Sequence, residues 1–592
     1  MKTTRSAAIL LGVAGALAAW AVVLKMTGGL DLRPVGIPFR TTDWFRPAVA
    51  AGVALAIWVF RFPRSAVRAI DGIVALTDRI APMLAIALAI GTLIVGLRFG
   101  TYVAGGADSY GYLSEARLWL AGDLVVPQPF TRHLPWPEQD ETFSPLGYRP
   151  WLSGGAIVPR YSPGLPILMA LAARVVGECG FYLITPLLGA ITIWLTYLLG
   201  VHTGSRIAGV AAAGLLATSP VFVFMLLSPM TDVPVMPFFA AALLLAWSQV
   251  RAHTFWTGLA LSGAIMIRPN LAPVAGVFAI FLAIRETTWR QRFVAMAMLA
   301  AGLLPSVVAI GIINAHLYGS PGRSGYGDLR ELYAWGFLFE NLTRYPTWLI
   351  ETHTPLIALC VVPLIAIRRV DAGSRAGILL CAALVVALWA SYLFYLVFDA
   401  WWYLRFVLAS FPPILVLAMH GWRLVAGILP AWGRAVILAG VFAGVATFQV
   451  QVIQEKELLN FRIGESVYPS AAAYVDKMLP RNALIISMLH SGSIRFYANR
   501  LTMRFEVLDP VWWPRAVDVL VSKGYRPYVL LAESEEEQFR QRFGLGANDD
   551  APGSILAEIA EPQHVRLYDP LRQVAPAKPD PIPRVLVCPC GW

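Results

Sequence analysis

The sequence is poor in charged residues. Only 14% of its 592 residues are Asp, Glu, Lys or Arg, whereas 57% are hydrophobic. A soluble domain carries about a quarter charged residues, so this composition excludes an ordinary soluble protein. Apolar runs of close to ~20 residues, the length that crosses a bilayer, recur over most of the chain. We therefore predict a polytopic α-helical membrane protein.

Motifs for nucleotide and zinc chemistry are also missing. The sequence has no Walker loop, no Gly-x-Gly-x-x-Gly after a strand and no His-Glu-x-x-His, so a nucleotide-sugar site is not indicated. The net charge is +11, but the arginines concentrate in short loops between apolar runs. Membrane topology and anionic lipids account for arginines in such places. We expect membrane lipids as partners and no nucleic acid.

Cysteine is scarce, with five residues in the chain. Cys179, Cys360 and Cys381 lie in or beside apolar runs and are most simply packing residues. Cys588 and Cys590 fit either a disulfide or a weak metal clip, since two ligands do not make a structural zinc site. The sequence leaves that choice open.

The apolar runs alternate with basic loops, which sets the predicted topology. Residues 7–24 follow Lys2 and Arg5 and form an uncleaved anchor or a signal peptide; we favour the anchor because the run is long. A basic cluster at 61–68 is expected in the cytoplasm, so the run 81–98 crosses outward. Continuing along the chain gives about thirteen spans, with a cytoplasmic N-terminus and an external C-terminal part.

The chain is expected to have four regions. Towards its end, helical patterns alternate with short apolar strands, which is typical of a small α/β domain. The long loop after the run 81–98 is rich in proline and aromatics, and we expect an ordered external lobe there. The regions are residues 1–78 with extra N-terminal helices, 79–453 as the membrane module with external loops 100–160 and 316–351, 454–569 as the α/β domain, and 570–592 as a Pro-rich, poorly ordered tail.

An acidic, aromatic-rich stretch, Gly105–Glu115, follows directly on the outward run. Asp108 is predicted to be the N-cap of a helix over 109–121. A helix N-terminus also keeps a carboxylate ionised and aims it, as a general base requires. The two roles are compatible, and Asp108 is our best candidate for a base. Tyr110 and Tyr112 are stacking residues or, as we favour, interfacial anchors; Glu115 is expected to face solvent.

Asp232 is the second candidate acid. It lies at the outer mouth of a predicted span, between Pro229 and Pro234. A carboxylate in a proline-broken membrane segment is costly and usually has a partner. Asp232 is therefore either an interfacial helix cap or a group that helps position an acceptor hydroxyl or a metal ion.

Two arginines stand at predicted outer turns, where positive charge is unexpected. Arg268 is bracketed by apolar runs, and Arg405 follows an aromatic triplet that includes Trp402 and Tyr403. Arginine binds phosphate with two parallel hydrogen bonds. The alternative is that both side chains reach lipid headgroups. Arg149 and Arg160, in the first external loop, are further candidates of the same kind.

These motifs together resemble a known group of enzymes, the GT-C superfamily of polyprenyl-phosphate-sugar-dependent glycosyltransferases. The resemblance is to its bacterial protein-mannosyltransferase and lipid A aminoarabinose-transferase branch, and covers roughly residues 81–450. The matching motifs are Gly106–Tyr110, Tyr161–Pro166, Ser228–Asp232 with Pro234, Arg268–Asn270, and Trp402–Arg405 with Pro412 and Pro413.

The resemblance implies an inverting transfer at the periplasmic face of a bacterial inner membrane. Asp108, helped by Asp232, would activate the hydroxyl of a lipid, glycan or protein acceptor. The sugar would leave a polyprenyl phosphate held by the outer arginines, with substrate contacts from Tyr110, Tyr161, Trp402 and Tyr403.

The chain departs from the family pattern in two ways. Two spans precede the Asp-bearing unit, and Asp108 stands alone where many members have an acidic pair. A divalent metal ion therefore remains possible, and no other cofactor is expected. A membrane transporter or lipid flippase is the alternative function, because it shares the spans and the membrane arginines. The absence of an apparent two-fold repeat and the large external loops argue against it.

Overall fold

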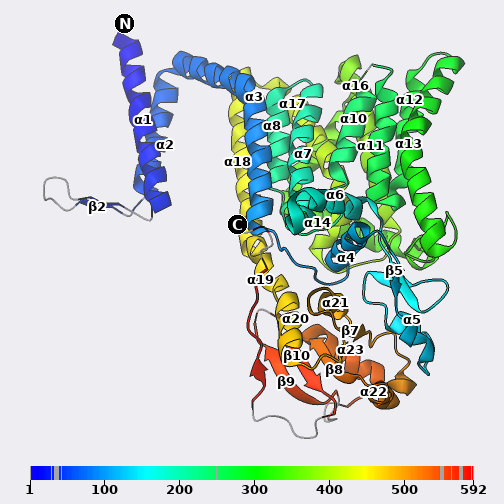
Figure 1. Cartoon of the computed structure of the whole chain (residues 1–592). Coiled ribbons are helices and arrows are strands. Elements are labelled where there is room, and N and C mark those ends of the chain that lie inside the picture. Colours follow the sequence, from blue (N-terminus) through cyan, green and yellow to red (C-terminus); the bar gives the residue numbers. More distant parts are fainter. Residues whose placement is uncertain are drawn as a thin grey trace. The chain divides into compact units, whose positions relative to one another are not determined.

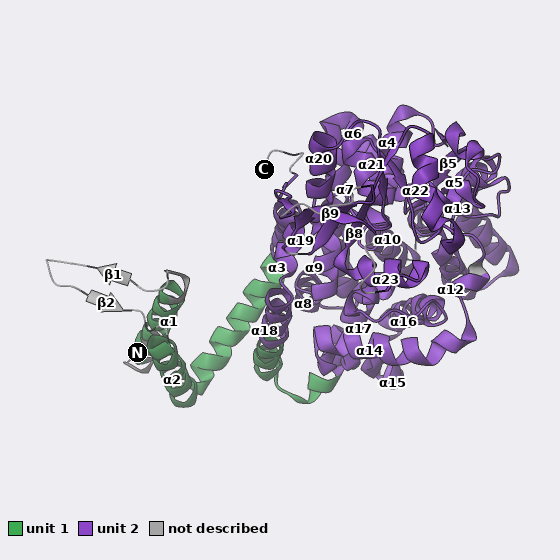
Figure 2. Ribbon diagram, turned by 90° about the horizontal axis from the view of Figure 1, so that it is seen from below, with its two compact units in different colours: residues 1–81, 425–441 green, residues 82–424, 442–592 purple. Residues whose placement is uncertain are grey.

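The structure is a computed structural model that describes residues 2–27, 30–32, 39–41, 43, 45–248, 250–546, 552–561, 563–571, 578–587 and 590. The chain forms two compact units (Figure 2). One comprises residues 1–81 and 425–441, and the other residues 82–424 and 442–592.

The first unit is built on a pair of helices. α1 (Lys2–Thr27) packs along α2 (Phe45–Arg61). A two-stranded antiparallel sheet, β1 (Leu30–Leu32) and β2 (Phe39–Thr41), connects them. Trp58 and Ala66 are the buried centre of a small apolar cluster at the start of α3 (Pro63–Phe99).

The second unit contains a helical bundle in which the long helices run side by side (Figure 1). Small residues allow its tightest contacts, as is common between membrane helices. A Cβ added to Gly258 would lie 2.3 Å from a carbonyl oxygen of the facing helix, and Gly302 is equally crowded. The helices are α4 (Asp108–Ala121), α6 (Gly164–Val176), α7 (Gly180–His202), α8 (Arg206–Ala217), α9 (Pro220–Leu226), α10 (Met236–Trp247), α11 (His253–Ile267), α12 (Ala275–Arg285), α13 (Trp289–Tyr318), α14 (Leu338–His353), α15 (Val362–Ile365), α16 (Ala372–Leu393), η9 (Trp401–Ser410) and α17 (Phe411–Val425). α18 (Ala431–Glu455) begins in the first unit and continues into the second at residue 442.

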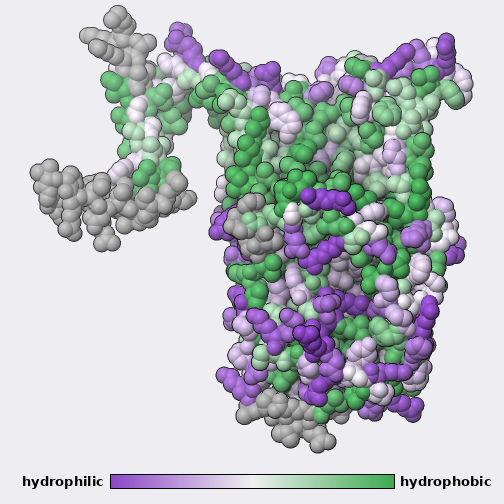
Figure 3. Space-filling view, viewed as in Figure 1, coloured by the Kyte–Doolittle hydropathy of each residue, from purple (hydrophilic) through white to green (hydrophobic). Residues whose placement is uncertain are grey.

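Six helical segments of the described chain are long and apolar enough to cross a membrane, or up to eight if each of two bent pairs is one span. The prediction of a multi-pass helical membrane protein is therefore confirmed, but the predicted count of about thirteen spans is not. Several runs that the sequence offered as spans form short helices, such as α10 with 12 residues, and others are broken at prolines. Apolar surface covers the helical part of the second unit, and polar surface gathers below it (Figure 3).

The C-terminal part is a small α/β domain, as predicted. Its six-stranded sheet has the order β11-β9-β10-β8-β6-β7, in which β6 is parallel to both β7 and β8, and β10 is antiparallel to β8 and β9. The strands are β6 (Ala483–Ile486), β7 (Leu501–Met503), β8 (Arg526–Ala532), β9 (Ser554–Ile559), β10 (Val565–Asp569) and β11 (Asp580–Pro581). The helices are α19 (Phe461–Glu465), α20 (Val467–Met478), α21 (Ser491–Ala498), α22 (Trp513–Ser522) and α23 (Glu533–Phe543).

Residues 100–160, which we predicted to be the first external loop, form regular structure and share a core with this domain. It forms a three-stranded sheet of β3 (Val126–Pro127), β5 (Ala156–Pro159) and β4 (Tyr148–Pro150), preceded by η2 (Pro129–His133) and α5 (Gln139–Thr142). Trp136 and Phe143 from the loop are buried in the same apolar cluster as Phe505 and Phe539 of the domain. Loop and domain therefore exclude water from one continuous core.

The described tail residues are not a free end, which corrects the expectation of poor order. β11 pairs with β9, and the Val585 N–H donates to Ser470 Oγ at 2.7 Å. Cys590 forms a disulfide with Cys179, so Cys179 is a crosslink rather than a packing residue. Cys588 lies outside the described residues, and Cys360 and Cys381 are free thiols.

Candidate active site

Asp108 begins α4, but it does not cap the helix. Ala107 holds the N-cap position and makes no side-chain cap bond, so the predicted cap was wrong. The Asp108 carboxylate instead accepts a 3.0 Å hydrogen bond from Nη2 of Arg405, in η9. The Asp108 side chain is 30% exposed, whereas that of Arg405 is 14% exposed. The Asp108 carboxylate therefore has a buried cationic partner and can still be reached from the protein surface.

Asp232 lies between two arginines in the loop between α9 and α10. It is 1% exposed, and its Oδ1 accepts a short hydrogen bond from Nη2 of Arg268. Its Oδ2 lies 4.0 Å from Nη1 of Arg405. Burying a carboxylate in a membrane protein requires such partners. Asp108, Arg405, Asp232 and Arg268 thus form one row of alternating charge.

Arg268 is held by several neighbours at the C-terminal end of α11, where Pro269 ends the helix. Its Nε donates to Thr231 Oγ1 at 3.2 Å and its Nη1 to the Tyr392 hydroxyl at 3.5 Å. Asn270 Nδ2 donates to the same hydroxyl at 2.9 Å. The Arg-Pro-Asn motif is therefore fixed around Tyr392, and the guanidinium has little spare hydrogen-bonding capacity.

Arg405 keeps spare capacity. Its Nη1 contacts the Met230 sulfur at 3.5 Å, and its guanidinium lies 5.5 Å and 5.4 Å from the ring centres of Tyr403 and Phe406. Its Nε is buried and has no acceptor in the part of the chain that the structure describes. A buried donor without an acceptor is costly, so an oxygen-bearing ligand would be favoured at this position.

Three tyrosines border Asp108. Tyr161 lies near enough to Asp108 for the carboxylate charge to act on its hydroxyl. The Tyr161 ring lies 4.9 Å from that of Tyr112 and 5.9 Å from that of Tyr326. Burial and the nearby Asp108 charge raise the pKa of Tyr161 well above its ordinary value, so its hydroxyl stays protonated. A Cβ at Gly111 would lie 2.4 Å from the Tyr161 ring, so glycine is needed there.

The other predicted residues lie outside this row. Arg149 donates to the backbone carbonyls of Ser324 and Gly325 and so ties the two external loops together. The Arg160 backbone N–H donates to the Gly147 carbonyl at 2.9 Å. Tyr110 is 4% exposed and packs against Phe496 of the C-terminal domain.

The aromatic triplet lies beside Arg405. Trp402 is 40% exposed and lies near Phe224, with ring centres 6.3 Å apart. Tyr403 stacks on Phe398 at 3.9 Å.

Glu115 is buried, against our expectation that it faces solvent. It is 2% exposed, and its Oε1 accepts from the Trp119 indole at 3.2 Å. Burial raises the pKa of Glu115 to about 8. The expectation failed because α4 is packed on more than one side, which a single helix sequence does not reveal. Thr231, Tyr326 and Tyr392 were also missed, since nothing in their local sequence separates them from ordinary packing residues.

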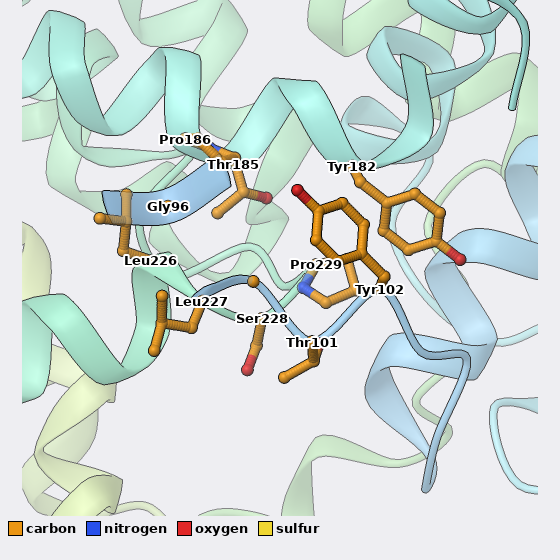
Figure 4. Close-up of a pocket in the computed structure, with 11 residues that line it drawn as sticks. Gly96, Thr101, Tyr102, Tyr182, Thr185, Pro186, Leu226, Leu227, Ser228 and Pro229 are labelled. Atoms are coloured by element: carbon orange, nitrogen blue, oxygen red, sulfur yellow. The ribbon is translucent and has the colours of Figure 1, made fainter. Parts of the chain in front are cut away.

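A small pocket lies next to this region, between the end of α3 and the start of α7 (Figure 4). Tyr102, Tyr182 and Thr185 line it with Ser228 and Pro229. Its open volume of about 10 Å³ matches roughly one water molecule. The pocket is therefore too small for a sugar, and none of the four charged residues lines it. Within the described residues, no three His, Cys, Asp or Glu side chains come together as a metal site.

Residues 160–310 match the family described as dolichyl-phosphate-mannose-protein mannosyltransferase. This stretch contains Tyr161, Asp232 and Arg268. No curated protein matches the sequence.

Solved structures share the fold. ArnT from Cupriavidus metallidurans, bound to undecaprenyl phosphate, is 13% identical and has a TM-score of 0.53, with 84% of this chain and 99% of that chain covered. Its apo state gives the same identity and coverage with a TM-score of 0.51. The Archaeoglobus fulgidus oligosaccharyltransferase is more distant, at 12% identity and a TM-score of 0.48, covering 76% of this chain and 70% of that one. Residues 160–310 thus resemble that mannosyltransferase family, and the chain shares its fold with ArnT.

Proposed function

We propose that the protein transfers a sugar from a polyprenyl-phosphate donor to an acceptor hydroxyl with inversion, on the extracytoplasmic face of a bacterial inner membrane. The observation that carries the proposal is the Asp108–Arg405 pair. A partly exposed carboxylate at a helix N-terminus contacts a buried guanidinium that retains an unused donor. A base for the acceptor and a donor for the leaving phosphate therefore lie side by side.

The reaction uses the two groups in turn. A donor phosphate competes with Asp108 for Arg405, because the two free oxygens of the phosphodiester monoanion can both accept from the guanidinium. Asp108 then accepts the proton of the acceptor hydroxyl as its oxygen attacks the anomeric carbon. The bond from that carbon to the phosphate oxygen breaks, and the phosphate retains the electron pair. Arg405 stabilises the charge that develops there.

Asp232 and Arg268 support this step indirectly. Asp232 is too buried to reach an acceptor, but it lies between both guanidiniums and cancels their mutual repulsion. We therefore assign Asp232 to positioning Arg405 and Arg268. Trp402 and Tyr403, next to Arg405, are placed to contact the donor. The contacts of Tyr110 and Arg149 favour structural roles, whereas the Arg160 guanidinium stays a candidate for contact with the donor phosphate.

The Cys179–Cys590 disulfide supports the proposed orientation. Structural disulfides form and persist in oxidising compartments such as the bacterial periplasm. Cys179 precedes α7, and Cys590 ends the described tail of the C-terminal domain. We accordingly assign residues 79–453 to the catalytic membrane module and residues 454–569 to a periplasmic domain, with the N-terminus in the cytoplasm.

The test compares a deletion strain with its parent for loss of one radiolabelled sugar from lipid, glycan or protein fractions. Complementation with Asp108→Asn should restore the label about 10²–10⁴-fold more slowly than wild type. Asp518→Asn, an exposed carboxylate of the C-terminal domain, is the matched control and should restore it fully. Undiminished transfer by Asp108→Asn rules Asp108 out as the base. Lipid scrambling without any sugar transfer would favour a flippase.

A further inference from the structure

The backbone just before Asp108 is held by two tyrosines of the C-terminal domain. The Ala104 N–H donates to the Tyr497 hydroxyl, on α21, at 2.8 Å. The Tyr468 hydroxyl, on α20, lies beside Gly106, 3.6 Å from where a Cβ of that residue would be. Ala104 is fully buried, and a buried amide without an acceptor is costly. The two tyrosines therefore limit the direction in which the chain enters α4.

Gly105 packs against the same domain. A Cβ at this position would lie 2.5 Å from the Tyr468 ring and 2.7 Å from Oε2 of Glu465. Gly106 has φ +55°, in the left-handed region that favours glycine. The two glycines let the backbone come close enough to contact Tyr468.

The domain also contacts the far end of the loop. The Leu146 N–H donates to Ser491 Oγ at 3.2 Å. The neighbouring Gly147 lies against the Ala107 carbonyl, 3.0 Å from where its Cβ would be. α21 thereby packs against both ends of the loop, and it contacts α4 directly (Figure 1).

We propose that Tyr468 and Tyr497 are positioning residues, and that the C-terminal domain aims the catalytic base. This inference rests on the proposed function of Asp108. The two hydroxyls act through the backbone of residues 104–106, two residues from the carboxylate. Displacing a catalytic group by about 1 Å costs about 10²-fold in rate. Without these acceptors the loop retains its fold, but Asp108 samples orientations that miss the acceptor hydroxyl.

The experiment uses Tyr468→Phe, Tyr497→Phe and the double variant in full-length protein reconstituted in lipid nanodiscs. Each change removes one hydroxyl and keeps the ring. Tyr474→Phe is the matched control, since Tyr474 lies on α20 and its hydroxyl instead donates to Asp580 at 3.1 Å. Hydrogen exchange is measured over residues 103–110. Transfer is measured with undecaprenyl phosphate carrying radiolabelled mannose, glucose or aminoarabinose.

We expect amide exchange at residue 104 to rise at least about tenfold in the double variant. We expect kcat to fall about 10–100-fold while KM for the donor changes less than about threefold, because Arg405 is untouched. The Tyr474→Phe control should match wild type in both measurements. Unchanged amide exchange would show that the two tyrosines do not hold the loop. Raised exchange with unchanged kcat would show that holding the loop does not position Asp108.

A variant on the loop side tests the same contact. Gly105→Ala pushes the backbone away from Tyr468, so it should lower kcat like the double tyrosine variant. Gly464→Ala, on α19, is the control, because its added Cβ meets no atom within 4 Å. If Gly105→Ala and Gly464→Ala have equal kcat, the positioning role is wrong. If Asp108→Asn is as active as wild type, the proposed function fails first.

Discussion

Two groups of acids in the second unit are treated in opposite ways. At the candidate site, the half-buried Asp108 and the buried Asp232 each lie within 4.0 Å of an arginine nitrogen. In the loop and the C-terminal domain, Glu115 and Glu535 are buried and Glu465 is half-buried, and none of the three forms a salt bridge to a described basic residue. Burial raises the pKa of Glu465 and of Glu535 to about 7. The site pairs its acids with arginines, whereas the surrounding scaffold holds carboxyl groups that are easily neutralised.

This difference has a physical cause. A buried carboxylate remains ionised only when nearby cations offset its loss of hydration. Glu535 receives N–H bonds from Leu489 and Ala532, but no described cation forms an ion pair with it. Replacing an acid with its amide keeps the shape of the side chain. This change should therefore have opposite effects on the stability of the protein in the two groups.

Asp232→Asn should give the larger effect. It leaves Arg268 and Arg405 buried together without the charge between them, and breaking a buried pair typically costs about 3–5 kcal/mol. We expect transfer to fall about 100-fold, as for loss of one electrostatic contact in an active site, and the melting temperature in detergent to drop. Both are measured against Asp518→Asn. Unchanged melting with lost transfer would instead make Asp232 a reacting group.

Glu465→Gln should raise stability at alkaline pH. The pKa of Glu465 is raised in the folded protein, so folding favours its protonated form. Its contribution to stability is complete below the unfolded pKa of about 4.3 and is lost as pH rises through about 7. The melting temperature should therefore fall from pH 5 to pH 8.5 for wild type and fall less for Glu465→Gln. Glu561→Gln, an exposed control, should follow wild type; parallel curves for all three would contradict the assignment.

The sequence predicted the charged residues of the site better than their surroundings. Asp108, Asp232, Arg268 and Arg405 are conspicuous because charge is rare in apolar chains, and the structure brings all four together. Tyr326 and Tyr392 were not foreseen, because an aromatic residue near a membrane helix is unremarkable until its neighbours are known. The cap at Asp108 was wrong because a long-range arginine competes with the local helix amides, and no local pattern reports such a partner.

The Cys179–Cys590 crosslink was missed for a similar reason. The two cysteines are 411 residues apart, and spacing alone does not determine which cysteines pair. The nearer pairing of Cys588 with Cys590 was equally plausible from sequence. A contact of the tail helps to explain the observed pairing. Arg462 Nη2 donates a hydrogen bond to the Val587 carbonyl at 2.8 Å and so directs the end of the chain towards α7.

The smallest effect is expected from breaking this crosslink. Cys179→Ser with Cys590→Ser removes a constraint on the unfolded chain, which typically contributes about 2–4 kcal/mol. The tail keeps its pairing of β11 with β9 and the Val585–Ser470 bond, so the Asp108 loop stays in place. We expect a lower melting temperature with transfer within about twofold of wild type. Cys360→Ser, which removes a free thiol, should change neither. If the double serine variant instead loses transfer like Tyr468→Phe with Tyr497→Phe, the tail itself holds the domain against the loop, and the two tyrosine hydroxyls are not sufficient to aim the base.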